Sequence, residues 1–250
     1  MSDLGSWLQT VPYFTRYWFC STIAVSLIAR FQLVNPMYLV LTNEAFSSFQ
    51  IWRFVTCILY FPITPMTGFR FLLNLYFLYN YSRRLEESTF AGRPSDYCFM
   101  LVFNAICCII FAFFMNILYL MDLMVLSVLY IWCQLNRETI VTFWFGTRFK
   151  AVYLPWVLLA FNVVLNGGGV MELIGILVGH VYFFLKFKYP QELEGPTLLE
   201  TPAFLKQIFP DQVGGVHSFG SPPQRPAQGQ GGGNNNRFPG WGRGYVLGGN

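Results

Sequence analysis

Residue types that could support acid–base or nucleophilic chemistry are few in this chain. One of its 2 histidines, His180, lies about two helical turns beyond Glu172, and Ser127 has no flanking glycine. A serine nucleophile needs a positioned base and oxyanion donors, and neither is visible here. We therefore predict no catalytic residue. His180 is expected to be a hydrogen-bonded core residue, and Glu172 lies at the mouth of its predicted helix, where simple solvation would account for it.

Arg70 and Asn74 form a polar pair whose spacing suggests a site. They lie four residues apart in an apolar stretch, so they share a helix face. Charged groups at membrane depth are costly and usually mark a polar cavity or a protein interior. Arg70 is also close to the end of its stretch, where its side chain could reach the interface instead. Both interpretations stay open.

Metal-binding chemistry is not expected. The cysteines lie in or beside apolar runs without C-x-x-C spacing, and a structural zinc site needs a cluster of such ligands. We predict no metal, no cofactor and packed, reduced thiols. The 6 cysteines are Cys20, Cys57, Cys98, Cys107, Cys108 and Cys133.

The elements that must position these residues are short apolar helices. The chain is 54% hydrophobic and 11% charged, against about 25% charged in soluble domains, which indicates an integral membrane protein. Crossing roughly 30 Å of hydrocarbon takes about 20 apolar residues. Most runs are shorter, so the bundle must thin the membrane, oligomerise or shelter polar groups at depth. The predicted spans are 17–33, 67–81, 97–115, 123–135, 151–165 and 170–185.

Basic residues divide unevenly between the two sides of these spans. Only Arg30, Arg53 and Arg70 fall on one side, and the excess falls on the side that holds both chain ends. That excess marks the cytosolic side, so both termini are predicted to be cytosolic. Asp3 and no basic residue precede the first apolar stretch, so we expect no cleavable signal. The net charge of +4 reflects the loop bias, and no nucleic-acid partner is expected.

The segment between the first two spans is too apolar for a loop exposed only to water. Apolar stretches with aromatic edges usually lie in the membrane interface. Trp52 and Arg53 suit that level, because each pairs an apolar body with a polar end. A functional motif and a simple aromatic anchor are both consistent with this pattern. In the last span, Gly175 and Gly179 are spaced to let two helix backbones approach closely, which predicts helix packing.

The C-terminal region changes composition. Residues 189–212 still predict a short helix with Thr201 as N-cap and Pro202 at its first position. Residues 214–250 are rich in Gly, Pro, Gln and Asn and cannot bury a core. Within that tract, 241–248 reads Trp-Gly-Arg-Gly-Tyr-Val-Leu-Gly. Anchors that fill pockets, with glycines that let the backbone approach a partner, predict a docking motif; a solvated end is the alternative.

Three stretches resemble, in order, the landmarks of the rhomboid superfamily. Those landmarks are a W-R-x-x-T loop, an H-x-x-x-N element in the second span and an A-H-x-x-G-x-x-x-G element in the sixth. The matching positions are Trp52, Arg53, Thr56, Arg70, Asn74, Glu172, Gly175 and Gly179. Arg70 replaces the first histidine, Glu172 replaces the catalytic one, and no G-x-S-G surrounds Ser127. The resemblance therefore implies a rhomboid-like protein without the catalytic serine–histidine pair.

Among non-catalytic rhomboids, the chain resembles the Derlin family along nearly its whole length, and within it the first paralogue. The matching stretches are 74–79, 127–130, 143–149 and 154–157. The resemblance implies an all-α polytopic membrane protein, with a rhomboid-like six-helix domain over 1–188 and a largely disordered cytosolic tail over 189–250. It also implies a protein of the endoplasmic reticulum membrane that helps misfolded proteins return to the cytosol in ER-associated degradation.

The tail motif is similar to the SHP box through which Derlins bind the hexameric valosin-containing ATPase. All fixed positions of its W-G-x-G-x-x-L-G core are present, at Trp241, Gly242, Gly244, Leu247 and Gly248. The partners that the resemblance implies are this ATPase, membrane ubiquitin ligase complexes, misfolded clients, the lipid bilayer, and further subunits in a homo- or hetero-oligomer.

Three other functions remain open on the sequence. A scaffold would gather ligase, client and ATPase without a conduit. A solute channel would use the polar residues at depth, which are Arg70, Asn74, Asn104 and Asn162. An intramembrane serine protease fits least, because neither base nor oxyanion donors accompany a serine.

Overall fold

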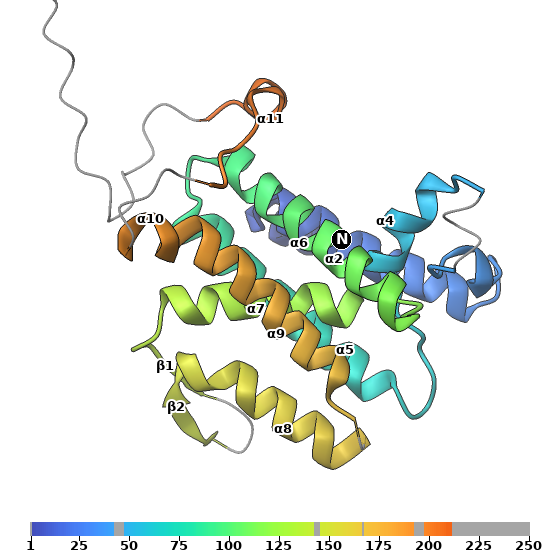
Figure 1. Ribbon diagram of the computed structural model, residues 1–250. Coiled ribbons are helices and arrows are strands. Elements are labelled where there is room, and N and C mark those ends of the chain that lie inside the picture. The colour runs from blue at the N-terminus through green and yellow to red at the C-terminus, as the bar shows by residue number, and fades with distance from the viewer. Residues whose placement is uncertain (1, 43–47, 143–145, 167, 193–197, 212–250) are drawn as a thin grey trace, which may run out of the picture. The chain divides into compact units, whose positions relative to one another are not determined.

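A computed structural model describes residues 2–42, 48–142, 146–166, 168–192 and 198–211 (Figure 1). This part of the chain is mostly helical. Its α-helices are α1 (Ser2–Thr10), α2 (Tyr13–Arg30), α4 (Ile51–Leu59), α5 (Gly68–Phe77), α6 (Pro94–Met115), α7 (Met121–Leu135), α8 (Leu154–Asn166), α9 (Val170–Phe183), α10 (Tyr189–Glu192) and α11 (Ala203–Ile208). Wide π-helical turns extend α5 and α9, over Leu78–Ser82, Leu85–Thr89 and Phe184–Lys188, and 3-10 turns form Pro36–Tyr38 and Ala151–Tyr153.

Each predicted span contains a helix, but the helices differ in length. Pro94–Met115 and Val170–Gln191 are long and apolar enough to cross a membrane. Met121–Leu135 and Ala151–Val164 are apolar and shorter. The count of six spans therefore stays a prediction, while the shortness of several helices is a property of the structure.

A two-stranded hairpin departs from the all-helical expectation. Strand β1 (Ile140–Thr142) pairs antiparallel with β2 (Arg148–Lys150), with Val141 opposite Phe149. The hairpin connects α7 to α8. Its strands have 3 residues each, too short for the alternation of apolar and polar residues to stand out in the sequence.

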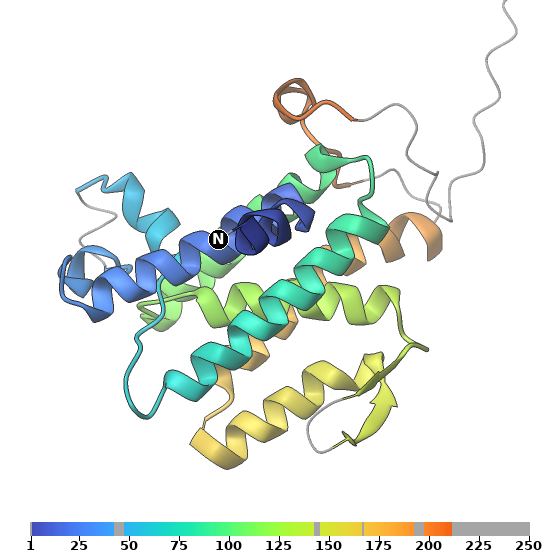
Figure 2. The same ribbon diagram turned by 180° about the vertical axis from the view of Figure 1, so that it is seen from behind.

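Helix α7 lies at the centre of the bundle. Every residue from Met121 to Cys133 is buried. Helices α4, α5, α6, α8 and α9 all contact it, and Figures 1 and 2 show it crossing between α5 and α9. Its apolar side chains therefore pack against other helices on all sides.

Two glycines bring α9 against α7. A Cβ atom added at Gly179 would lie 2.6 Å from the carbonyl oxygen of Ser127, and one at Gly175 would lie 3.0 Å from that of Leu123. No real side chain tolerates the first distance, so the two backbones touch where only hydrogen occupies the Cα position. This is the close approach that the spacing of the two glycines predicts.

A buried polar network fixes the start of α2. The Glu86 carboxylate accepts hydrogen bonds from the backbone N–H groups of Phe14 and Thr15, both at 2.9 Å, and from the Thr15 hydroxyl at 2.8 Å. The hydroxyls of Thr15, Ser82 and Tyr97 continue the network at 2.7 and 2.6 Å. Burial raises the pKa of the Glu86 carboxyl, and the two N–H donors oppose that shift. The network ties α2 to the extension of α5 and to α6.

The segment 198–211 docks against the helices. Leu205 of α11 is buried, and the ring of Phe209 lies 5.0 Å from that of Phe14. A helix was predicted here, but the prediction that Thr201 caps it was wrong. The Thr201 hydroxyl donates to Asp96 of α6, and Pro202 occupies the N-cap position.

Candidate functional site

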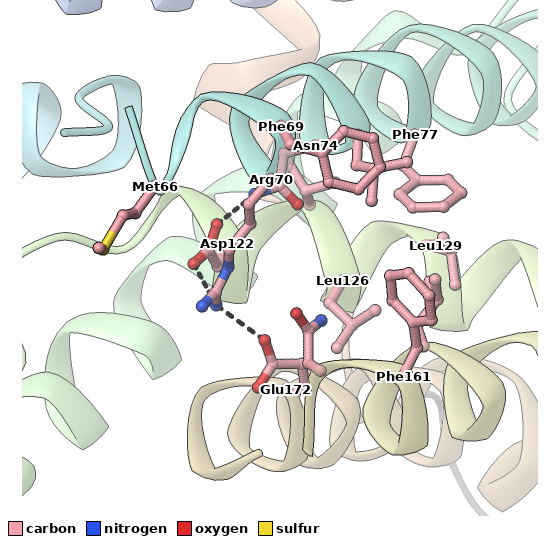
Figure 3. Close-up of a pocket in the computed structure, with 14 residues that line it drawn as sticks. Met66, Phe69, Arg70, Asn74, Phe77, Asp122, Leu126, Leu129, Phe161 and Glu172 are labelled. Atoms are coloured by element: carbon pink, nitrogen blue, oxygen red, sulfur yellow. Dashed lines mark hydrogen bonds and ion pairs between the residues drawn. The ribbon is translucent and has the colours of Figure 1, made fainter. Parts of the chain in front are cut away.

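Three helices bring charged side chains together at one end of α5, α7 and α9 (Figure 3). Arg70 on α5 donates from Nη2 to Asp122 Oδ2 on α7, at 2.6 Å, and to Glu172 Oε1 on α9, at 2.7 Å. Asn74, one turn beyond Arg70, donates to the other oxygen of Asp122. These four residues, Arg70, Asn74, Asp122 and Glu172, are called the charged cluster below.

Local helix chemistry favours the two acids and opposes the arginine. Asp122 and Glu172 lie in the first turns of α7 and α9, where unpaired N–H groups favour negative charge. Arg70 lies in the first turn of α5, so its position is favourable only because both carboxylates face it. The carboxylate side chains are 5% and 6% exposed, and that of Arg70 is 23% exposed. Arg70 therefore points into the protein and does not reach away to the interface.

A pocket of about 140 Å³ opens beside the charged cluster. Its polar end is formed by the cluster and Asn162, and its walls are apolar. Met66 and Phe69, at its edge, are 94% and 46% exposed. The apolar walls are Leu73, Phe77, Val125, Leu126, Leu129, Leu158 and Phe161. The pocket thus has apolar walls and one charged end.

The side chains with possible catalytic chemistry are engaged elsewhere. Ser127 is buried, and its hydroxyl donates to the Met124 carbonyl oxygen at 2.8 Å. His180 Nδ1 forms a 2.8 Å hydrogen bond with the Tyr130 hydroxyl. Within the described ranges, no group of three or more His, Cys, Asp or Glu is placed to hold a metal ion. The charged cluster offers charge and hydrogen bonds.

Sequence reasoning found half of this site. Arg70 and Asn74 were predicted, but Asp122 was missed, because it stands just outside the predicted span 123–135. The solvated interpretation of Glu172 is wrong, since its side chain is buried and paired. Asn162 lines the pocket. Asn104 lies apart on α6, fully buried, and its side-chain atoms have no hydrogen-bond partner in the part of the chain that the structure describes.

Trp52 and Arg53, the pair predicted at the membrane interface, have different surroundings in the structure. The Trp52 side chain is exposed on α4, as an interface anchor requires. Arg53 is buried and points the other way, donating to the carbonyl oxygens of Met37 at 2.9 Å and Val40 at 3.4 Å and to the Thr42 hydroxyl at 3.0 Å. The Arg53 guanidinium therefore holds the preceding loop onto α4, and the position of this residue at the depth of the membrane interface stays a prediction.

Replacing Arg53 by methionine is expected to destabilise the protein by about 2–3 kcal/mol, because buried carbonyl groups lose a charged donor. Trp52→Ala is the matched control on the neighbouring, exposed position, and should change stability by less than about 0.5 kcal/mol in detergent. Thermal unfolding of the purified variants measures both. Equal losses at the two positions would show that Arg53 has no special structural role.

The tail motif Trp241, Gly242, Gly244, Leu247 and Gly248 lies outside the described residues, and its role stays a prediction.

Comparison with known proteins concerns the chain as a whole. A family model described as the Der1-like family matches residues 11–203.

Proteins named Derlin-1 from several animals are similar to this chain. The human protein is 53% identical over 252 residues, which cover 99% of each chain. The Caenorhabditis elegans protein is 50% identical over 216 residues, 86% of this chain and 88% of that one. The Drosophila melanogaster protein is 45% identical over 247 residues, 98% and 99% of the two chains. The expected resemblance to the Derlins is confirmed, and the chain belongs to the Der1-like family.

Proposed function

We propose that this chain is a non-catalytic component of ER-associated degradation that helps misfolded proteins pass from the endoplasmic reticulum to the cytosol. Membership of the Der1-like family supports the pathway and the membrane. The observation that carries the mechanism is a charged cluster, with a pocket beside it, at one end of α5, α7 and α9. The engaged Ser127 and His180 agree with a role that needs no chemistry of its own.

Short helices would lower the cost of moving polar chain through lipid. Helix α8 has 13 residues and exposes Trp156 and Val164, so this outer helix rises only about 20 Å against roughly 30 Å of hydrocarbon. A bilayer fitted to α8 thins locally. Each unsatisfied backbone group in hydrocarbon costs several kcal/mol, so thinning and a polar cavity remove much of the barrier to passage.

An ATPase would supply the force that the membrane domain lacks. We propose that the valosin-containing ATPase docks on Trp241, Gly242, Gly244, Leu247 and Gly248, with both chain termini in the cytosol. Ubiquitin ligase complexes and misfolded clients would complete the assembly, with this chain acting in a homo- or hetero-oligomer.

A peptide spanning residues 236–250 tests the recruitment step. We expect the purified valosin-containing ATPase to bind it, and to lose binding when Trp241 and Leu247 are both alanine, because the two anchors that fill pockets are removed. Isothermal titration calorimetry measures both peptides. Absent binding, or equal binding of the two, would contradict ATPase recruitment through this motif.

A further inference from the structure

The pocket beside the charged cluster has the size of one long side chain. One turn of helix about 10 Å wide fills roughly 400 Å³, whereas the pocket holds about 140 Å³. A client helix would therefore lie outside and extend one residue inward. The exposed Met66 and Phe69 at the pocket edge mark where that residue would enter.

The charge of the cluster selects the kind of side chain. One guanidinium, that of Arg70, faces the carboxylates of both Asp122 and Glu172. With both acids ionised, the cluster carries a net charge of −1. Glu172 binds Arg70 through Oε1. An excess negative charge in a low-dielectric site favours a cationic ligand.

A divalent metal ion fits this site less well than an organic cation. Two carboxylates are too few ligands for a metal held by protein groups, and Arg70 already lies within 2.7 Å of each of them. An ammonium or guanidinium on a flexible stem matches both parts of the pocket. Its stem would contact the apolar walls, and its head would reach Glu172.

We infer that this pocket binds a basic side chain, lysine or arginine, of a client transmembrane helix. The inference rests on the proposed function, and it names the class of client that the site prefers. A charged residue in a helix surrounded by lipid is costly, and an unassembled membrane subunit exposes such residues when its partner is absent. The charged cluster offers that residue a carboxylate partner, so misassembled helices bind and fully apolar helices do not.

Binding of model helices to the full-length chain in lipid vesicles tests the inference. The probe is a dye-labelled helix of about 20 leucine and alanine residues with one lysine about one turn from its end. Otherwise identical helices carry methionine or glutamate at that position. Energy transfer to the dye-labelled chain measures affinity. We expect the lysine helix to bind about tenfold more tightly than the methionine helix, and the glutamate helix to bind most weakly.

Two variants assign the selectivity to the charged cluster. Glu172→Gln keeps the shape of the side chain and removes the excess negative charge, so the lysine and methionine helices should then bind equally. Asp122→Asn should have the same effect through the other carboxylate. Glu87→Gln is the matched control, because Glu87 pairs with Arg83 on the surface, away from the pocket, and should retain the tenfold preference.

Equal binding of the lysine and methionine helices to the unaltered chain would overturn the inference, and this comparison requires no variant to fold. Selectivity retained in both Glu172→Gln and Asp122→Asn would overturn it as well. The assay contains no ATPase, so its outcome is separate from recruitment. If the unaltered chain shows no preference for the lysine helix but the ATPase binds the 236–250 peptide, only the proposed site for a basic side chain is contradicted. If the preference is present but the ATPase does not bind the peptide, only ATPase recruitment is contradicted.

Discussion

Leucine at Gly175 is expected to yield no folded protein, and alanine at Gly179 is expected to destabilise the fold by about 1–3 kcal/mol. At both positions the added atoms meet the backbone of α7, which cannot rotate away as a flexible side chain can. The distance of 2.6 Å from a Cβ at Gly179 to the Ser127 carbonyl oxygen forces the two helices apart. Thermal unfolding and gel filtration in detergent measure both variants.

The expected loss of stability in Gly179→Ala is opposite in sign to the usual effect of this change in a helix. Alanine is favoured over glycine in helices by about 1 kcal/mol, so an unobstructed Gly→Ala change stabilises a helix. Gly68, at the start of α5, is the matched control, because a Cβ there meets nothing within 4 Å. Gly68→Ala should leave stability unchanged or raise it, while Gly179→Ala should lower it. A Gly179→Ala protein as stable as Gly68→Ala would refute the close α7–α9 contact.

Hydrophobic length and composition predict the helices of this fold well. The apolar runs are long enough to define each helix, and the observed bounds differ from the predicted spans by a few residues at most ends. The hairpin β1–β2 and the short α4 escape prediction, because elements of 3 and 9 residues leave little periodic signal. The cap of α11 was misassigned because the Thr201 hydroxyl prefers the distant Asp96 to the local backbone.

The candidate site could be predicted only where its residues share one helix. Arg70 and Asn74 are found by their spacing of four, since helix geometry places both on one face. Asp122 joins Arg70 across 52 residues of sequence, and no local rule gives that distance. A usable signal remains: an acidic residue at the start of an apolar run, in a chain with an unpaired arginine in another run, indicates a buried pair.

The orientation of the Arg53 side chain also depends on contacts that local sequence rules do not predict. An amphipathic side chain beside Trp52 fits the interface by composition. The loop that contains Met37 and Val40 folds over α4, so that Arg53 donates to the backbone carbonyls of both residues. Where a guanidinium points depends on which carbonyls the tertiary fold leaves to be satisfied.

Replacing Arg70 by methionine is expected to destabilise the protein by about 3–5 kcal/mol, because it leaves the carboxylates of Asp122 and Glu172 buried without a cation. Arg83→Met is the matched control. Arg83 pairs with Glu87 at the surface, where such pairs contribute about 0–1 kcal/mol. Denaturant unfolding of the two variants in detergent should therefore separate a buried ion pair from an exposed one.

A triple variant tests whether Arg70→Met loses stability through charge imbalance or through lost packing. Arg70→Met combined with Asp122→Asn and Glu172→Gln removes all three charges and keeps side chains of similar volume. Whole buried ion pairs can often be replaced by neutral groups at little cost, whereas half of a pair cannot. We therefore expect the triple variant to regain most of the stability that Arg70→Met loses. A triple variant as unstable as the single one would mean that the Arg70 side chain contributes through packing. Recovery of stability would mean that the fold tolerates a neutral pocket, so that stability alone does not require the charges of the cluster.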